Sequence, residues 1–223
     1  MPGNFLELSV WARDVAASVA FWEPLGFTHG AVGDTWKHRY AVLTDGRLVL
    51  GLHEYEFDSP SLTWVRPDLV AALPALQAMG IEFDFAKTGA DEFHEAGFRD
   101  PAGQVVTLLE ARTWSSVFDG TPSSSLLGYF LEYRYPARDP DATAAFWERL
   151  GLVRDADRHG PRAVTGGINL APRAALRTPQ LVFAHQDLAG AAQALAERGF
   201  AARPEPDGSL LLDAPDGLVI RLE

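Results

Sequence analysis

The 223-residue sequence contains no cysteine, which excludes disulfides, thiolate metal ligands and a cysteine nucleophile. It also lacks any apolar run approaching the roughly 20 residues needed to span a bilayer. The first residues, MPGNFLELSV, have neither the basic start nor the apolar centre of a signal peptide. We therefore expect a cytoplasmic protein with no membrane partner.

Positive charge is scarce. The net charge is −11, and residues 1–111 hold 7 Lys and Arg against 16 Asp and Glu, whereas residues 126–223 hold 11 against 13. The first part thus carries −9 and the second only −2. Such a field repels nucleic acid, so we expect no nucleic-acid partner. The acidic excess favours a cationic small molecule, unless it serves only solubility.

Several catalytic motifs are missing as well. The sequence has no G-x-S-x-G elbow, no phosphate-binding loop and no dinucleotide fingerprint. Its six histidines form no HxH or HExxH arrangement with metal-ligand spacing. Hydrophobic residues nevertheless make up 47% of the chain, enough for a packed core, so a folded globular protein is expected.

The sequence does contain a repeat. RDVAASVAFWEPLGF, which begins at Arg13, shares 9 of 15 positions with RDPDATAAFWERLGL, which begins at Arg138. Each copy has an Asp suited to a helix N-cap and a Gly suited to the left-handed residue that closes a helix. The segments 68–80 and 187–199 keep the same spacing from Asp to Gly. Four helices of one length with the same first and last residues indicate a four-fold repeated unit.

Short strand-like runs surround each of these helices. One run precedes each helix, namely FLELSVW, SLTWV, YFLEYRY and QLVFA, and further runs separated by turn signals follow. The repeated unit is therefore strand, helix and about three strands (βαβββ). This predicts an α+β protein with a first domain at 1–111, a linker at 112–125 and a second domain at 126–223.

Four βαβββ units, the RD…FW…LGF phrase and the run DPAGQVVTLLE resemble the vicinal oxygen chelate superfamily. That superfamily includes glyoxalase I, extradiol dioxygenases, fosfomycin-resistance enzymes and bleomycin-resistance proteins. The resemblance covers nearly the whole chain and implies two glyoxalase-like domains with curved, partly closed mixed sheets. It implies no particular reaction, because one fold hosts many functions.

The resemblance also implies where a metal would bind. Family metalloenzymes commonly place His seven residues before the Asp that starts a helix, and Glu in the last strand of a domain. In the first half these positions hold Glu7, Ser61 and Thr107, and in the second half Glu132, Gln180 and Arg221. Each set has one carboxylate with weak or cationic companions, too few strong ligands for a tight transition-metal site. We expect no cofactor and no metal, with a divalent metal as the alternative.

Alternation along the strands predicts which residues face the first cavity. Leu6, Leu8 and Val10 form the apolar set that should meet the helix, and His53 is assigned to the same face. The candidate ligand-binding residues are Glu7, Ser9, Trp11, Leu50, Ser61, Thr63 and Thr107, with Trp36 and His38 as further candidates. Such an apolar pocket with few polar groups suits a drug-sized or aromatic ligand. The equally weighted alternative is an ordinary core in which Ser and Thr hydroxyls satisfy Glu7.

In the second half, Arg221 is expected to pair with Glu132 across the cavity, with Arg134 nearby on the same face. Such a pair would satisfy two charges that are costly to bury. We favour this structural role over a ligand-binding one, which leaves the second cavity partly filled.

Two hypotheses about function remain open. The leading one is a protein like the bleomycin-resistance branch, which binds an aromatic or cationic small molecule without a metal. The competing one is a glyoxalase- or dioxygenase-type enzyme, either with a metal or with Glu7 as a general base. The oligomeric state is left as monomer or homodimer.

Overall fold

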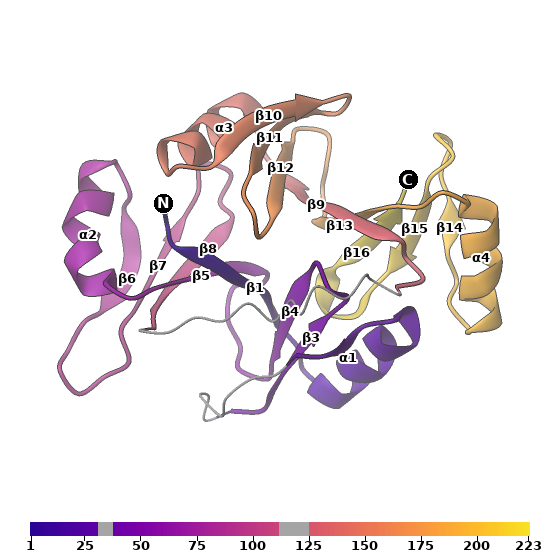
Figure 1. Cartoon of the computed structure of the whole chain (residues 1–223), viewed down its shortest axis with the longest axis horizontal. Helices are drawn as coiled ribbons and strands as arrows, with labels where there is room; N and C mark the ends of the chain where they lie inside the picture. The colour runs from indigo at the N-terminus through magenta and orange to yellow at the C-terminus, as the bar shows by residue number, and fades with distance from the viewer. Residues whose placement is uncertain (31–37, 112–124) are drawn as a thin grey trace.

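The computed structural model describes residues 1–30, 38–111 and 125–223, and contains two eight-stranded mixed sheets (Figure 1). The first sheet has the strand order β2-β3-β4-β1-β5-β8-β7-β6. Its strands, in chain order, are β1 (Asn4–Trp11), β2 (Thr28–His29), β3 (Tyr40–Thr44), β4 (Val49–His53), β5 (Ser61–Arg66), β6 (Phe83–Lys87), β7 (Glu95–Arg99) and β8 (Val105–Glu110).

The second sheet repeats this order as β10-β11-β12-β9-β13-β16-β15-β14. Its strands are β9 (Tyr129–Pro136), β10 (Val153–Asp157), β11 (Gly160–Val164), β12 (Asn169–Arg173), β13 (Gln180–Ala184), β14 (Arg203–Pro204), β15 (Leu210–Asp213) and β16 (Val219–Leu222). The α-helices are α1 (Val15–Trp22), α2 (Leu69–Ala78), α3 (Pro140–Arg149) and α4 (Leu188–Glu197), and two short 3₁₀ segments are η1 (Glu23–Leu25) and η2 (Pro215–Gly217).

The chain order confirms the α+β fold built from four βαβββ modules. Each sheet combines two consecutive modules, which meet through an antiparallel pair, β1 with β5 and β9 with β13. Both sheets are open, because their end strands do not pair with one another within the described residues. Neither sheet is therefore closed into a barrel over these residues.

The repeated Asp and Gly residues act largely as the sequence predicts. The side chains of Asp14, Asp139 and Asp187 each accept a hydrogen bond from a backbone N–H in the first turn of their helix. Asp68 is the exception, since its carboxylate accepts from the Arg66 side chain instead. Gly26, Gly80, Gly151 and Gly199 all have φ between 83° and 99°, the left-handed conformation that ends a helix cheaply only at glycine.

Pro24 shortens the first helix. The α-helical hydrogen bonds of α1 end at Trp22, and the chain continues as the 3₁₀ segment η1 up to Leu25. A proline ring at this point removes an N–H donor and crowds the preceding turn. Among the described residues, none of the helices has the length and apolar character required to cross a membrane.

The two halves of the chain pack together through the repeated Phe-Trp pair. In Figure 1, α2 and α4 lie at opposite ends of the molecule, with α1 and α3 nearer its middle. Trp147 of α3 donates from Nε1 to the buried carboxylate of Asp100 in the first half at 3.0 Å, and its ring lies 6.2 Å from that of Trp64. Phe21 of α1 reciprocates, with its ring 5.3 Å from that of Phe200. The repeat therefore joins the halves.

Candidate functional site

The first candidate site is built on one face of three neighbouring strands. Side chains alternate faces along β1, so Glu7 and Ser9 share one face while Leu8 packs in the core on the other. The β1–β5 register sets Thr63 opposite Glu7 and Ser61 opposite Ser9. The β5–β8 register sets Thr107 beside Thr63. Five of the sequence-predicted residues therefore lie together.

Glu7 lies at the base of this group, with 4% of its surface exposed. Its Oε1 accepts a hydrogen bond from Ser9 Oγ at 2.7 Å and lies 2.8 Å from His53 Nε2. Because the single Ser9 proton goes to Glu7, the 2.6 Å contact between Ser9 and Thr63 is donated by Thr63. A hydroxyl chain and an imidazole thus satisfy a carboxylate that would be costly to bury alone.

The hydrogen bonds continue outward through two histidines. His53 Nδ1 lies 3.1 Å from Nε2 of His38. A carboxylate can only accept, so His53 donates from Nε2 to Glu7 and its Nδ1 accepts from His38. This order leaves the lone pair of a neutral His38 on Nδ1. Burial, followed by the nearby His53, lowers the pKa of His38 and favours that neutral form.

A cavity of about 590 Å³ lies over this chain of side chains. Ser9, Ser61, Thr63, Thr107, His38 and His53 contribute to its wall, together with Tyr55, Phe57, Asp58, Asp84, Phe85, Lys87, Glu95, Arg99, Val105 and Leu109. The volume lies in the range of small-molecule sites, which is about 300–1,000 Å³. The wall therefore combines aromatic rings, hydroxyls, two histidines and five charged side chains. Glu7 does not line the cavity itself but lies behind His53, to which it is hydrogen-bonded.

Two predicted residues lie elsewhere. Leu50 is fully buried in the hydrophobic core, because the parallel β1–β4 register pairs it with Leu8 on the helix-packed face. Trp11 lines a different cavity, of about 1,050 Å³, which also contacts Tyr135 and Asp216 of the second half. The candidate Trp36 lies outside the described residues.

The prediction that His53 lies on the helix face is wrong. The same β1–β4 register sets Gly51 opposite Ser9 and His53 opposite Trp11, which places His53 on the cavity face. Gly51 is the residue in the sequence that could have indicated this arrangement. A Cβ at that position would lie 2.1 Å from Glu7 Oε1, so glycine makes room for the carboxylate.

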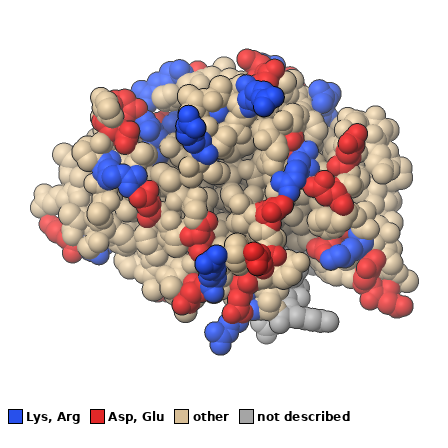
Figure 2. All heavy atoms as spheres, turned by 180° about the vertical axis from the view of Figure 1, so that it is seen from behind, with Lys and Arg blue, Asp and Glu red and all other residues tan. Residues whose placement is uncertain are grey.

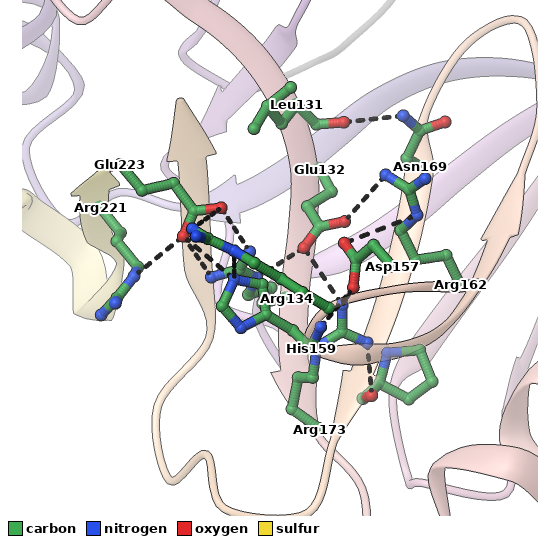
Figure 3. Close-up of polar contacts among 12 residues, drawn as sticks. Leu131, Glu132, Arg134, Asp157, His159, Arg162, Asn169, Arg173, Arg221 and Glu223 are labelled. Atoms are coloured by element: carbon green, nitrogen blue, oxygen red, sulfur yellow. Dashed lines mark hydrogen bonds and ion pairs between the residues drawn. The ribbon is translucent and has the colours of Figure 1, made fainter. Parts of the chain in front are cut away.

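The second half replaces these groups with arginines (Figure 3). Glu132, the counterpart of Glu7, is 1% exposed, and its Oε1 accepts from Arg134 Nε at 2.5 Å and from Arg173 Nη2 at 3.3 Å. Arg162 Nη1 lies 3.6 Å from the other oxygen. Arg134 also donates to both oxygens of Glu223, at 3.0 and 2.8 Å. Glu132 is therefore held by guanidinium groups.

The expected pair between Arg221 and Glu132 is not formed. Arg221 contacts Glu223, with Nε 3.4 Å from Oε2, and its Nη2 donates to Asp207. Gln180 and Arg221 both line a second cavity of about 480 Å³. Arg134 takes the place predicted for Arg221 because it lies two residues from Glu132 on the same strand face.

Several solved structures are similar to this chain over nearly its whole length. A catechol 2,3-dioxygenase matches 98% of this chain over 86% of its own, with a TM-score of 0.56 and 16% identity. The chain has the fold of the extradiol dioxygenases. A single-residue variant of homoprotocatechuate 2,3-dioxygenase from Brevibacterium fuscum matches 99% of this chain over 70% of its own, with a TM-score of 0.64 and 14% identity. A variant of 4-hydroxymandelate synthase from Streptomyces coelicolor matches 99% over 92%, with a TM-score of 0.61 and 13% identity.

These dioxygenases have vicinal oxygen chelate folds, which agrees with the resemblance at the level of the fold. No family model matches the sequence, and no curated protein matches it. At 13–16% identity, this similarity shows a shared fold and no shared reaction.

The side chains do not fit the metal site that the resemblance implies. In the first half, Ser61 and Thr107 bond to each other at 2.8 Å, and both ring nitrogens of His53 are engaged in hydrogen bonds. In the second half, guanidinium groups surround Glu132 and repel a cation. Within residues 1–30, 38–111 and 125–223, no three His, Asp or Glu side chains are grouped to hold a metal ion.

One face of the molecule carries charges of both signs. On the face opposite that of Figure 1, basic and acidic side chains are interspersed (Figure 2). Binding of nucleic acid depends on an extended basic surface, and this face does not provide one. The candidate sites are therefore the cavities.

Proposed function

We propose that the first half of the chain binds a small aromatic molecule, neutral or positively charged, in the cavity above Glu7, without a metal. The observation that carries this proposal is the buried Glu7–His53 pair at the base of a 590 Å³ cavity with aromatic walls. Pockets of this size with a few convergent polar groups are the usual form of a small-molecule site.

The aromatic wall supports a planar ligand. Tyr55 and Phe57 have nearly parallel rings with an interplanar angle of 14°, and Phe85 lies in the same wall. Tyr55 and Phe85 are exposed by 63% and 41% and line the same cavity, and exposed apolar patches of this kind often mark ligand-binding sites. An aromatic ligand between these rings would bury them.

The charge of the wall supports a neutral or cationic ligand. Among the described residues, Asp58, Asp84 and Glu95 line the cavity together with two basic side chains, Lys87 and Arg99. Lys87 pairs with Glu95, and Arg99 pairs with Asp58 and Asp84. Counting the carboxylate of Glu7 beneath, four acidic groups face two basic ones, so an anion would be repelled.

Calorimetric titration with three matched probes, benzylamine, benzyl alcohol and benzoate, tests the proposal. Binding of the cation or the alcohol should be weakened at least about tenfold by Thr107→Phe, which fills the cavity. Thr178→Phe, at an exposed position outside the cavity wall, is the matched control. Equal binding by both variants, or no binding of either probe to the unaltered protein, would reject the proposal.

The hydrogen-bonded chain Glu7–His53–His38 favours a second candidate, an enzyme that uses acid–base chemistry in the same cavity. Because His38 donates to His53 and His53 donates to Glu7, a proton taken up by a neutral His38 can be passed along the chain to the buried carboxylate of Glu7. Here Glu7 acts at a distance and His38 is the group that meets the substrate. The extradiol dioxygenase fold supports an enzyme only in general terms.

The ionisation of a bound chromogenic phenol separates the two candidates. If the chain acts as a base, 4-nitrophenol should bind to the unaltered protein as the yellow phenolate, with its O–H proton moved to His38. His38→Asn should bind it with similar affinity but as the colourless phenol. Binding as the neutral phenol by both proteins would leave the binding function and remove the enzymatic one.

A further inference from the structure

The second half contains a cavity that is the counterpart of the first. In the second sheet, Arg134 occupies the place of Ser9, because each lies two residues after the buried glutamate of its central strand. Gln180 lies opposite Arg134 as Ser61 lies opposite Ser9. Arg134 and Gln180 both line the second cavity, of about 480 Å³.

Two more register positions change from neutral to basic. Arg173 pairs with Pro136 as His53 pairs with Trp11. Arg221 pairs with Val182 as Thr107 pairs with Thr63. Three arginines therefore stand where the first cavity has serine, histidine and threonine, and all three line the second cavity.

The buried charges of this region do not balance. The side chains of Arg134, Arg162, Arg173 and Arg221 are 6%, 20%, 10% and 13% exposed, whereas the carboxylates buried among them are those of Glu132, Asp157 and Glu223, at 1%, 24% and 11%. Four guanidinium groups thus face three carboxylates. The remaining acidic partners, Asp155 and Asp207, are 48% and 57% exposed, so water screens their charge.

Arg173 shows the shortage most clearly. Its Nη1 donates to the backbone carbonyls of Pro161 and Pro172 at 2.6 and 3.1 Å, which carry no net charge. Its Nη2 lies 3.3 Å from Glu132 and 3.4 Å from Asp157, both long for charged hydrogen bonds, and its buried Nε has no hydrogen-bond partner among the described residues. Burial therefore lowers the pKa of Arg173 despite these carboxylates. For Arg134 burial acts in the same direction, but bonds to Glu223 and Glu132 outweigh it and raise the pKa.

Most of the remaining wall is apolar, formed by Pro140, Pro161, Pro172, Ala174, Ala175 and Leu176. Its two polar members are His159 and Asp207, which accepts a hydrogen bond from Arg221. A bare inorganic ion would leave most of 480 Å³ unfilled and would not use this surface. An organic acid with a hydrocarbon group matches both the basic and the apolar parts of this wall. Planar guanidinium groups bind its carboxylate, and the prolines and alanines pack against its hydrocarbon group.

We propose that the second cavity binds a small organic acid, with its carboxylate held by Arg173 and Arg221 and its apolar body against the proline-rich wall. This site is separate from the cavity above Glu7, for which a neutral or cationic ligand is proposed. The proposal does not depend on the function proposed for the first half.

Calorimetric titration at low ionic strength with benzoate, hexanoate and the neutral benzyl alcohol tests this site. At least one of the two acids should bind both the unaltered protein and Thr107→Phe, whose first cavity is filled. In Thr107→Phe this acid should bind at least about tenfold more tightly than the alcohol. Arg221→Gln should weaken binding of the acid at least about tenfold. Arg177→Gln, which removes an exposed arginine outside the cavity wall, should leave it unchanged.

The comparison of acid with alcohol in Thr107→Phe decides the matter even where Arg221→Gln fails to fold, because the arginines of the second cavity are intact there. Binding of neither acid, equal binding of acid and alcohol, or an unchanged affinity in folded Arg221→Gln would overturn the proposal. Loss of acid binding in Thr107→Phe alone would place the acid in the first cavity and would overturn it too.

Discussion

Glu7 and His53, on adjacent parallel strands, form a buried pair with 2.8 Å between Oε1 and Nε2. Neither side chain is more than 7% exposed. The pair lies on the face where the resemblance implies a metal. Its hydrogen bonds engage Glu7 Oε1 and both ring nitrogens of His53, which are atoms that could otherwise bind a metal. It therefore gives the cavity a fixed polar base with no need for an ion.

The room for this pair comes from Gly51. Gly51→Ala would set a Cβ 2.1 Å from Glu7 Oε1, so the carboxylate must move away from His53. We expect the free energy of unfolding to fall by about 1–3 kcal/mol, measured by urea denaturation. Gly166→Ala is the matched control, because a Cβ there meets nothing within 4 Å. Equal stability of the two variants would show that Gly51 does not accommodate Glu7.

Acid should weaken the protein through His38. Burial, and then the neighbouring His53, lower the pKa of His38 from its ordinary 6.5, so the folded state binds this proton less tightly than the unfolded state. The stabilisation is present above 6.5 and is lost as the pH falls through the lowered value. Between about pH 7.5 and about pH 5, the unaltered protein should therefore lose more stability than His38→Asn in urea denaturation. Parallel losses would contradict this role of burial.

The hydrogen bond from Trp147 to Asp100 should stabilise the junction of the halves. Trp147→Phe removes it, together with some buried ring volume. Trp64→Phe removes a similar volume from the neighbouring fully buried ring, but Trp64 Nε1 has no hydrogen-bond partner within the described residues. Trp147→Phe should therefore cost about 1–3 kcal/mol more than Trp64→Phe in thermal or urea unfolding. If Trp64→Phe lowers the free energy of unfolding more than Trp147→Phe does, ring packing and not the hydrogen bond stabilises the junction.

Local signals in the sequence predicted much of the fold. Helix caps and closing glycines depend on neighbouring residues only, so Asp14 and Gly26 could be recognised from their spacing. The same spacing located Glu7, seven residues before Asp14. Open sheet edges were not predictable in this way, because closure depends on how distant strands curve and pair.

Pairing between strands explains the errors at the site. The alternating leucines around Leu50 suggested a cavity face, yet the parallel register with β1 reverses the assignment and brings His53 to Glu7. In the second half, Arg221 and Arg134 both suited Glu132 by type. The structure selects Arg134, because its place on the same strand holds its guanidinium at 2.5 Å while Arg221 turns to Glu223.

The central claim is that the cavity above Glu7 binds its ligand without a metal. Calorimetric titration of chelator-treated protein with the tighter of benzylamine and benzyl alcohol, repeated after addition of Fe²⁺, Mn²⁺ or Zn²⁺, tests it most directly. We predict one ligand per chain in this cavity with the same dissociation constant before and after metal addition. Binding that appears only after a metal is added would contradict the claim.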